Sequence, residues 1–184
     1  MTVTGDRIIV LNSYLRADWQ HAITQQYLRA CTLDRLRIAS EALPREFGFA
    51  VFDAWRPLAL QQELFDAHEN PEVGSELWTM VAPLSSDPAT PPPHLTGGTV
   101  DLTLTWHGEP LALGTDFDDT TYKAELGAYE QMPGAVQALR RLLFHALRDA
   151  GFVALKEEWW HYEHGTRLWS AVTDTPPRYG PATP

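Results

Sequence analysis

The chain has 184 residues, of which 44% are hydrophobic and 21% are charged, as in an ordinary globular protein. Its formal net charge of −10 disfavours nucleic acid and anionic membrane surfaces, and we expect neither as a partner. The single cysteine excludes an intrachain disulfide, and residues 1–16 lack the basic segment and long apolar run of a signal peptide. We therefore expect a cytoplasmic protein with one domain over residues 1–184.

The N-terminal part of the chain predicts a short strand followed by two helices. Residues 8–11 are apolar and fit the strand, and residues 21–31 are expected to be helical. Cys31 falls in this periodic stretch, so we expect it to be a small core residue. Thr32 is a suitable N-cap for the second helix, which Pro44 would close.

The next elements predicted are a strand, two helices and a stiff loop. Residues 47–55 fit a mostly buried strand, and Pro57 suits the first position of a helix over residues 57–68. A short helix is expected over residues 73–81. Residues 82–93 end in three consecutive prolines, which are extended and stiff and should hold the histidine that follows in place.

Residues 99–106 alternate between apolar and polar side chains, as a strand with one buried face does. The apolar positions are Val100, Leu102, Leu104 and Trp106. Asp101 lies on the polar face, where we expect a cleft. Gly97 and Gly98 would let the backbone turn between His94 and Asp101.

The C-terminal part carries a long loop and the clearest amphipathic helix. Residues 114–134 are irregular and acidic, and are long enough to be an active-site loop. An apolar stripe predicts a helix over residues 136–150, with Arg140 and Arg141 away from the stripe and Gly151 as its C-cap.

The predicted elements together indicate an α+β fold, with helices packed against a central antiparallel or mixed sheet that carries the functional residues. Residues 152–155 begin a last strand. The proline- and glycine-rich residues 174–184 are expected to form a poorly ordered tail.

Two short segments carry candidate metal ligands. The first offers His94 and Asp101, and the second offers His161 with Glu158 three residues before it. Two imidazoles and a carboxylate suit Zn²⁺, leaving a fourth position open for water, although these donors also accept other divalent metals. Glu158 and His161 would face opposite ways on a regular strand, so we expect a bulge or bend there.

The sequence therefore predicts that His94, Asp101 and His161 are zinc ligands, with a buried polar cluster as the alternative. Glu158 is predicted to take a proton from the zinc-bound water and pass it to the leaving amine. Glu157 is the neighbouring candidate, but the spacing to His161 favours Glu158.

The joint pattern resembles the D-alanyl-D-alanine dipeptidase family of the vancomycin-resistance type. The resemblance covers about residues 33–165, with its motifs in the family's order. The matching motifs are Asp53-Ala54-Trp55-Arg56-Pro57, His94-x-x-Gly97-x-x-x-Asp101-Leu102-Thr103-Leu104, Gly114-Thr115-Asp116-Phe117-Asp118, Gly151-Phe152 and Glu158-Trp159-Trp160-His161-Tyr162.

This resemblance implies one zinc ion per subunit and a small dipeptide such as D-Ala-D-Ala as the substrate. In the family, the arginine matched by Arg56 stabilises the oxyanion formed as water attacks the peptide carbonyl. The position of Asp118 holds the free ammonium of the substrate. The alternatives are a structural salt bridge between Arg56 and Asp53, and a turn-capping role for Asp118.

The chain departs from the family pattern at Trp55, where the family has tyrosine, and at Pro92, where it usually has serine. Two other functions therefore also fit the chain: a zinc peptidase or amidase acting on another cell-wall peptide or a specialised metabolite, and a zinc-stabilised binding domain without activity. Antibiotic resistance, wall recycling and biosynthesis are each compatible with the chain. So is a homodimer.

Overall fold

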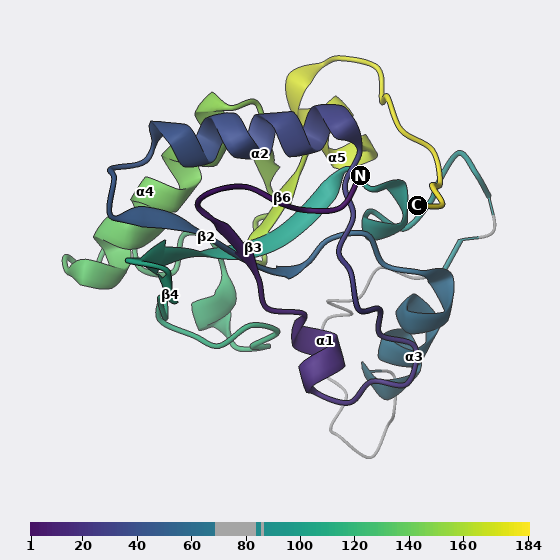
Figure 1. The fold of residues 1–184 in the computed structure, drawn as a ribbon, viewed down its shortest axis with the longest axis horizontal. Helices are drawn as coiled ribbons and strands as arrows, with labels where there is room; N and C mark the ends of the chain where they lie inside the picture. Colours follow the sequence, from purple (N-terminus) through teal and green to yellow (C-terminus); the bar gives the residue numbers. More distant parts are fainter. Residues whose placement is uncertain (69–83, 86) are drawn as a thin grey trace.

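A mixed sheet forms the centre of the molecule (Figure 1). The computed structural model describes residues 1–68, 84–85 and 87–184, and within them the sheet has six strands in the order β1-β2-β3-β6-β5, with β4 paired to β3. β1 is parallel to β2, and the other pairings are antiparallel. The strands are β1 (Ile8–Val10), β2 (Phe47–Asp53), β3 (Thr99–Trp106), β4 (Glu109–Pro110), β5 (Val153–Ala154) and β6 (His161–Glu163).

Helices lie on both sides of this sheet, which confirms the predicted α+β class. Figure 1 shows α2 and α4 together on one side, and α1 and α3 on the other. The helices are α1 (Ser13–Arg16), α2 (Ala30–Ala42), α3 (Leu58–His68), η2 (His94–Thr96), η3 (Tyr122–Ala124), α4 (Ala135–Asp149) and α5 (Arg167–Thr173). Of the helices described, none has the length and apolarity needed to cross a membrane.

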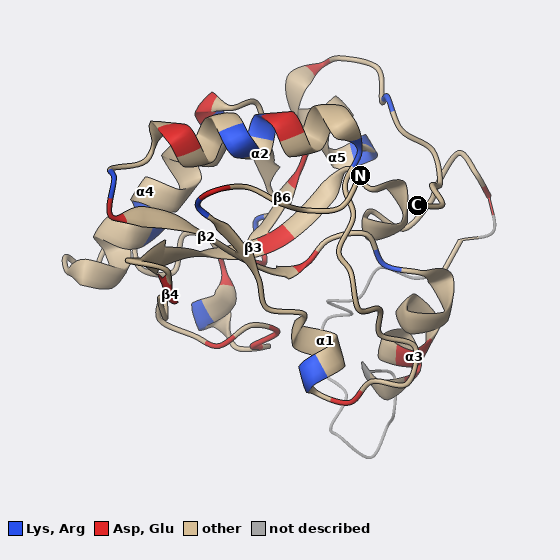
Figure 2. Ribbon diagram, in the orientation of Figure 1, with Lys and Arg blue, Asp and Glu red and all other residues tan. Residues whose placement is uncertain are grey.

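Charged residues are spread over several elements rather than gathered on one. The chain has 24 acidic and 14 basic residues, and Figure 2 shows both kinds interspersed along the helices and loops. The excess negative charge is therefore distributed around the fold, and it includes acidic groups close to the centre of the sheet.

The strand, helix and cap predicted most directly from periodicity are present. β3 covers the predicted residues, and α4 begins one residue before its predicted start and ends one residue before its predicted end. Gly151 follows the helix in the left-handed region, at φ 91°, and the amide of Phe152 donates to the Leu147 carbonyl. A helix stop of this kind suits glycine because it has no Cβ.

β3 differs from the prediction in what covers its two faces. Trp106, predicted to be in the core, is 44% exposed and packs edge-on against Phe47, with ring centroids 4.9 Å apart. The polar face, predicted to line a cleft, is itself buried, including Asp101. Both deviations arise because neighbouring elements cover the middle of β3 and leave its end uncovered.

Three predictions around the start of α2 were wrong. Residues 21–29 are not helical, because this segment runs beside the N-terminus: the Val3 amide donates to the Gln26 carbonyl and the Leu28 amide to the Met1 carbonyl. The helix begins at Ala30, so Thr32 lies inside it and does not cap it. Cys31 is exposed, since it lies on the outward side of the first turn.

The predictions for α3, for residues 73–81 and for Arg140 had three different outcomes. α3 confirms the helix predicted after Pro57. The helix expected over residues 73–81 lies outside the described residues. Arg140 was predicted to point away from the core, but it is 3% exposed, because the loop before α4 folds over its side chain.

Residues 174–184 run back over the segment that carries His94. The amides of Arg178 and Tyr179 donate to the Gly165 carbonyl at 2.7 and 3.1 Å. Further along, the Ala182 amide donates to the Leu95 carbonyl at 2.9 Å, and the Ala182 carbonyl accepts from the Trp55 indole at 2.9 Å. The tail thus contacts residues directly next to His94 and Arg56.

His164 is fully buried among aromatic rings. The rings of Phe152, Trp169 and Tyr179 lie around it, with centroids 5.2–6.1 Å away. Its Nε2 has no hydrogen-bond partner among the described residues. Burial, with the nearby positive charges of Arg35 and Arg178, lowers the pKa of His164 to about 4.

This pKa predicts a loss of stability in mild acid. In the unfolded chain the histidine has a pKa near 6.5, so between about pH 6.5 and 4 the unfolded state binds the proton and the folded state does not. The free energy of unfolding should therefore fall by up to about 1.4 kcal/mol for each pH unit as the pH is lowered through this range.

The His164→Phe variant, measured beside the wild type by urea unfolding with chelator present, should not show this loss of stability. If the free energies of unfolding of the two proteins fall in parallel as the pH is lowered, the assignment of the loss to His164 is wrong.

Candidate metal centre

His94 is held at the start of η2 by the proline-rich segment before it. The amides of Leu95 and Thr96 donate to the carbonyls of Pro92 and Pro93, each at 3.1 Å, which closes the short helix. The Nδ1 atom of His94 lies 2.6 Å from the Ala54 carbonyl, which fixes Nδ1 as the protonated nitrogen. The unprotonated Nε2 then faces Asp101, 3.2 Å from Oδ2.

Asp101 lies opposite Asp53 across the pair of strands β2 and β3. The register shifts between Val51 and Asp53, so Phe52 is an extra residue on β2. Such a bulge re-aims the side chains that follow it. Here it brings two carboxylates together on one face, and both are buried.

The segment from Glu158 to His161 forms the bend that was predicted. The His161 amide donates to the Glu158 carbonyl at 3.4 Å, with buried Trp159 and Trp160 at the turn between them. The two polar side chains therefore converge: His161 Nδ1 lies 3.4 Å from Glu158 Oε2 and 3.0 Å from Asp101 Oδ1.

The other nitrogen of His161 is held by Glu163, two residues along β6. Nε2 of His161 lies 2.9 Å from Oε1 of Glu163, which is buried. A carboxylate behind a ligating imidazole fixes its tautomer and raises its basicity. Sequence reasoning missed Glu163, although its spacing of two from His161 on a strand places both on one face.

The three predicted ligands meet at one point. Ligand atoms of His94, Asp101 and His161 all lie within 4.8 Å of one another. Since the outer imidazole nitrogens donate to Ala54 and Glu163, both inner nitrogens present lone pairs to the Asp101 carboxylate. Oδ1 of this carboxylate is buried and has no hydrogen bond within the described part of the chain. A buried group of three acceptors with two nitrogens and an oxygen fits a divalent cation such as Zn²⁺.

Glu158 lies at the edge of this group. Burial raises the pKa of Glu158 to about 8, opposed by His161 and assisted by the negative charge of Asp101. A carboxyl with a pKa near neutrality can both accept and release a proton at physiological pH.

Arg56 follows β2 and its guanidinium is held from several sides. Nε donates to Asp53 Oδ2 at 2.9 Å, and Nη1 donates to the Gln61 side chain at 3.1 Å. Nη2 donates to the Tyr14 hydroxyl at 3.1 Å and lies 3.8 Å from Asp101 Oδ2. The predicted salt bridge with Asp53 therefore exists, and the same arginine also lies near the carboxylate of the candidate ligand Asp101.

Asp118 is brought to the same region by tertiary contacts. It adopts the left-handed conformation at φ 61°, and its side chain hydrogen-bonds to that of Tyr14 on α1. Burial raises the pKa of Asp118 to about 6, with Arg56 opposing the shift. Tyr14 links Asp118 to Arg56 and was missed, because no local pattern connects α1 to residues more than forty positions away.

The structure thus brings all six predicted site residues into one region, where Asp118 is half-buried and the other five are buried. Comparison with known proteins extends this finding. Residues 29–179 match the family model described as D-ala-D-ala dipeptidase. The chain is 27% identical over 167 residues to a D-alanyl-D-alanine dipeptidase of Synechocystis sp., covering 75% of this chain and 68% of that protein.

A second relative is the D-alanyl-D-alanine dipeptidase of Escherichia coli. It is 31% identical over 114 residues, and the alignment covers 61% of this chain and about half, 53%, of the relative. The family model alone spans most of the chain, and it agrees with the resemblance inferred from the motifs. The chain therefore belongs to the D-ala-D-ala dipeptidase family and is a metallopeptidase.

Proposed function

We propose that this protein is a zinc-dependent dipeptidase that hydrolyses D-Ala-D-Ala or a closely related small dipeptide. The observation that carries the proposal is the convergence of the His94, Asp101 and His161 ligand atoms with the Glu158 carboxyl beside them. Both relatives, which are named D-alanyl-D-alanine dipeptidases, support the substrate class.

His94, Asp101 and His161 would hold the zinc ion, one per subunit. When bound, zinc supplies a Lewis acid that polarises a peptide carbonyl and acidifies water. Glu158 takes the proton from the attacking water and delivers it to the nitrogen of the leaving amino acid. Its position beside His161 and its raised pKa support this role.

Arg56 stabilises the negative charge that develops on the substrate carbonyl oxygen. Burial alone would lower the pKa of Arg56, but Tyr14, Asp53 and Asp101 raise it by more. The net pKa lies above the usual value for arginine, so the guanidinium stays charged. Its orientation is set by Asp53 and Gln61 before substrate arrives. A donor that is already oriented in a buried site stabilises the transition state most strongly, typically by about 3 kcal/mol.

Asp118 binds the free ammonium of the substrate. The carboxyl of half-buried Asp118 hydrogen-bonds to Tyr14, which also accepts from Arg56, so the ammonium site is tied to the oxyanion site. An ammonium fixed at this place limits the substrate to one residue on the amino side of the cleaved bond. The enzyme would therefore cut dipeptides and not the interior of longer chains.

Pro92 favours a second candidate, a zinc peptidase or amidase acting on another cell-wall peptide or a specialised metabolite. The family usually has serine at this position, and proline has no hydroxyl to offer a substrate. The Pro92 carbonyl also accepts a hydrogen bond from the Leu95 amide of η2, so Pro92 lies close to the proposed ligand His94.

A panel of peptides tests the proposal. Zinc-loaded protein should hydrolyse D-Ala-D-Ala with a kcat/KM at least about tenfold above that for L-Ala-L-Ala or a D-Ala tripeptide. Chelation should abolish the activity and added zinc should restore it. Cleavage of another peptide or amide in preference would favour the second candidate. Turnover that survives complete removal of metal would refute zinc dependence.

A further inference from the structure

Arg140 on α4 is a buried cation that donates only to backbone in the described residues. Its Nε donates to the Leu113 carbonyl at 2.7 Å, Nη1 to Glu125 at 2.8 Å and Nη2 to Lys123 at 2.8 Å. Buried charges are usually paired with an opposite charge. Here the arginine instead uses all three nitrogens to bind carbonyls of one segment.

Two aromatic rings flank the guanidinium and bind the same segment. Its carbon lies 4.6 Å from the ring centre of Tyr129 and 5.3 Å from that of Trp159. The Tyr129 hydroxyl donates to the Gly114 carbonyl at 3.0 Å, and the Trp159 indole donates to the Thr115 hydroxyl at 2.8 Å. Cation–π contacts of this kind are stronger where water is excluded.

These contacts close the base of a loop. Leu113 stands at one end of residues 113–125, and Lys123 and Glu125 stand at the other, so one guanidinium joins both ends. Loops with joined ends hold their shape through their own packing. Asp118 lies near the middle of this loop, on the part that reaches the metal site.

The side of the loop that faces the site is held by Phe117. Its ring stacks on Phe52, with centroids 4.7 Å apart, and meets Tyr14 edge-on at 5.6 Å. These contacts can hold the middle of the 113–125 loop in place only while the two ends of the loop keep their positions. Trp159 adds a second link, because it is bonded to Glu158 and its amide donates to the Ala124 carbonyl at 2.9 Å.

We propose that Arg140 is a positioning residue that closes the 113–125 loop, places Asp118 and so sets the preference for substrates with a free ammonium. This rests on the proposed function of Asp118. Burial lowers the pKa of Arg140 to about 10, so the guanidinium remains charged at neutral pH. Lysine could not replace it, because a single ammonium cannot reach carbonyls on both ends of the loop in a planar fork.

The first test measures the loop directly and needs neither metal nor substrate. Amide hydrogen exchange is compared between wild type, Arg140→Met, Arg140→Lys and the control Arg141→Met. Arg141, the next residue, is 51% exposed and pairs with Glu130 on the surface. Exchange within residues 113–125 should rise at least about tenfold in Arg140→Met, less in Arg140→Lys and not in the control. Unchanged exchange in both Arg140 variants would overturn the proposal.

The second test measures selectivity as the ratio of kcat/KM for D-Ala-D-Ala to that for its N-acetyl derivative. The ratio should fall by about tenfold in Arg140→Met, or in Arg140→Lys should the methionine variant not fold, and stay constant in Arg141→Met. Adding Asp118→Asn should lower it no further than Asp118→Asn alone, because both act through one carboxylate. A wild-type ratio retained by the Arg140 variants would overturn the proposal. If wild type cleaves neither peptide, the proposed function fails, while the exchange result still decides whether Arg140 holds the loop.

Discussion

The Glu158→Gln variant is expected to lose turnover while keeping its metal. Glutamine fills the same volume but cannot take a proton from water, so kcat should fall by roughly 10³-fold. Since Glu158 is not one of the three proposed ligands, the metal should stay bound at one ion per chain. Steady-state kinetics on D-Ala-D-Ala, together with elemental analysis of the same sample, measure both quantities.

Glu157→Gln is the matched control, because it removes the same charge one residue earlier on an exposed side chain. It should keep nearly full activity. If Glu158→Gln turns over at the wild-type rate, the proton transfer assigned to this residue is wrong. Should the variant lose its metal instead, Glu158 belongs to the ligand set.

The Asp101→Asn variant is expected to lose both metal and activity. Asp101 contributes the only negative charge among the proposed ligands, and it lies between His94 and His161. An amide is a weak ligand for zinc, so affinity should drop by at least about 10²-fold and turnover should fall with it. Competition with a chelator of known affinity gives the dissociation constant, and elemental analysis after dialysis gives the remaining occupancy.

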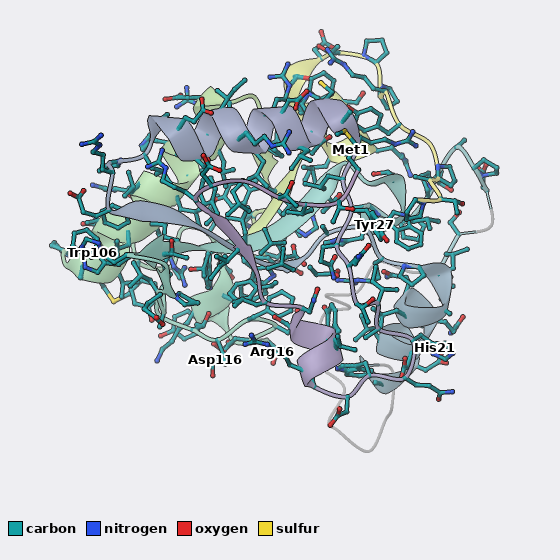
Figure 3. The ribbon with its side chains drawn as sticks, viewed as in Figure 1. Met1, Arg16, His21, Tyr27, Trp106 and Asp116 are labelled. Carbon is teal, nitrogen blue, oxygen red and sulfur yellow. The ribbon has the colours of Figure 1, made fainter. Side chains whose placement is uncertain are left out.

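Asp116→Asn controls for the change in net charge. Asp116 is exposed and lies at the edge of the molecule in Figure 3, in the same loop as Asp118. It should leave metal affinity unchanged. An Asp101→Asn variant that still binds one zinc with wild-type affinity would remove Asp101 from the proposed ligands.

Much of the fold could be predicted because its signals are local. The alternation of residues 99–106 defines β3, and the stripe ending before Gly151 defines α4. These patterns depend only on the strand period of 2 and the helix period of 3.6. Residues 21–29 deviate from such a prediction because their backbone groups pair with the N-terminal segment, and that pairing overrides local helix preference.

The residues of the candidate site divide in the same way. His94, Asp101 and His161 could be proposed as metal ligands from the sequence, because two imidazoles and a carboxylate at the family's spacing form a recognisable sequence motif. Tyr14 and Glu163 could not, since their importance comes from hydrogen bonds to side chains that are themselves placed by the fold.

Arg140 shows the limit most clearly. Its helix position predicted an outward-facing charge, yet the structure buries it beneath a loop whose carbonyls it binds. The sequence by itself determined the family, the candidate metal ligands and the main elements, because these depend on composition, period and spacing. Only the tertiary structure decided which polar groups contact the candidate ligands and the 113–125 loop, because hydrogen bonds between distant segments exist only after those segments pack together.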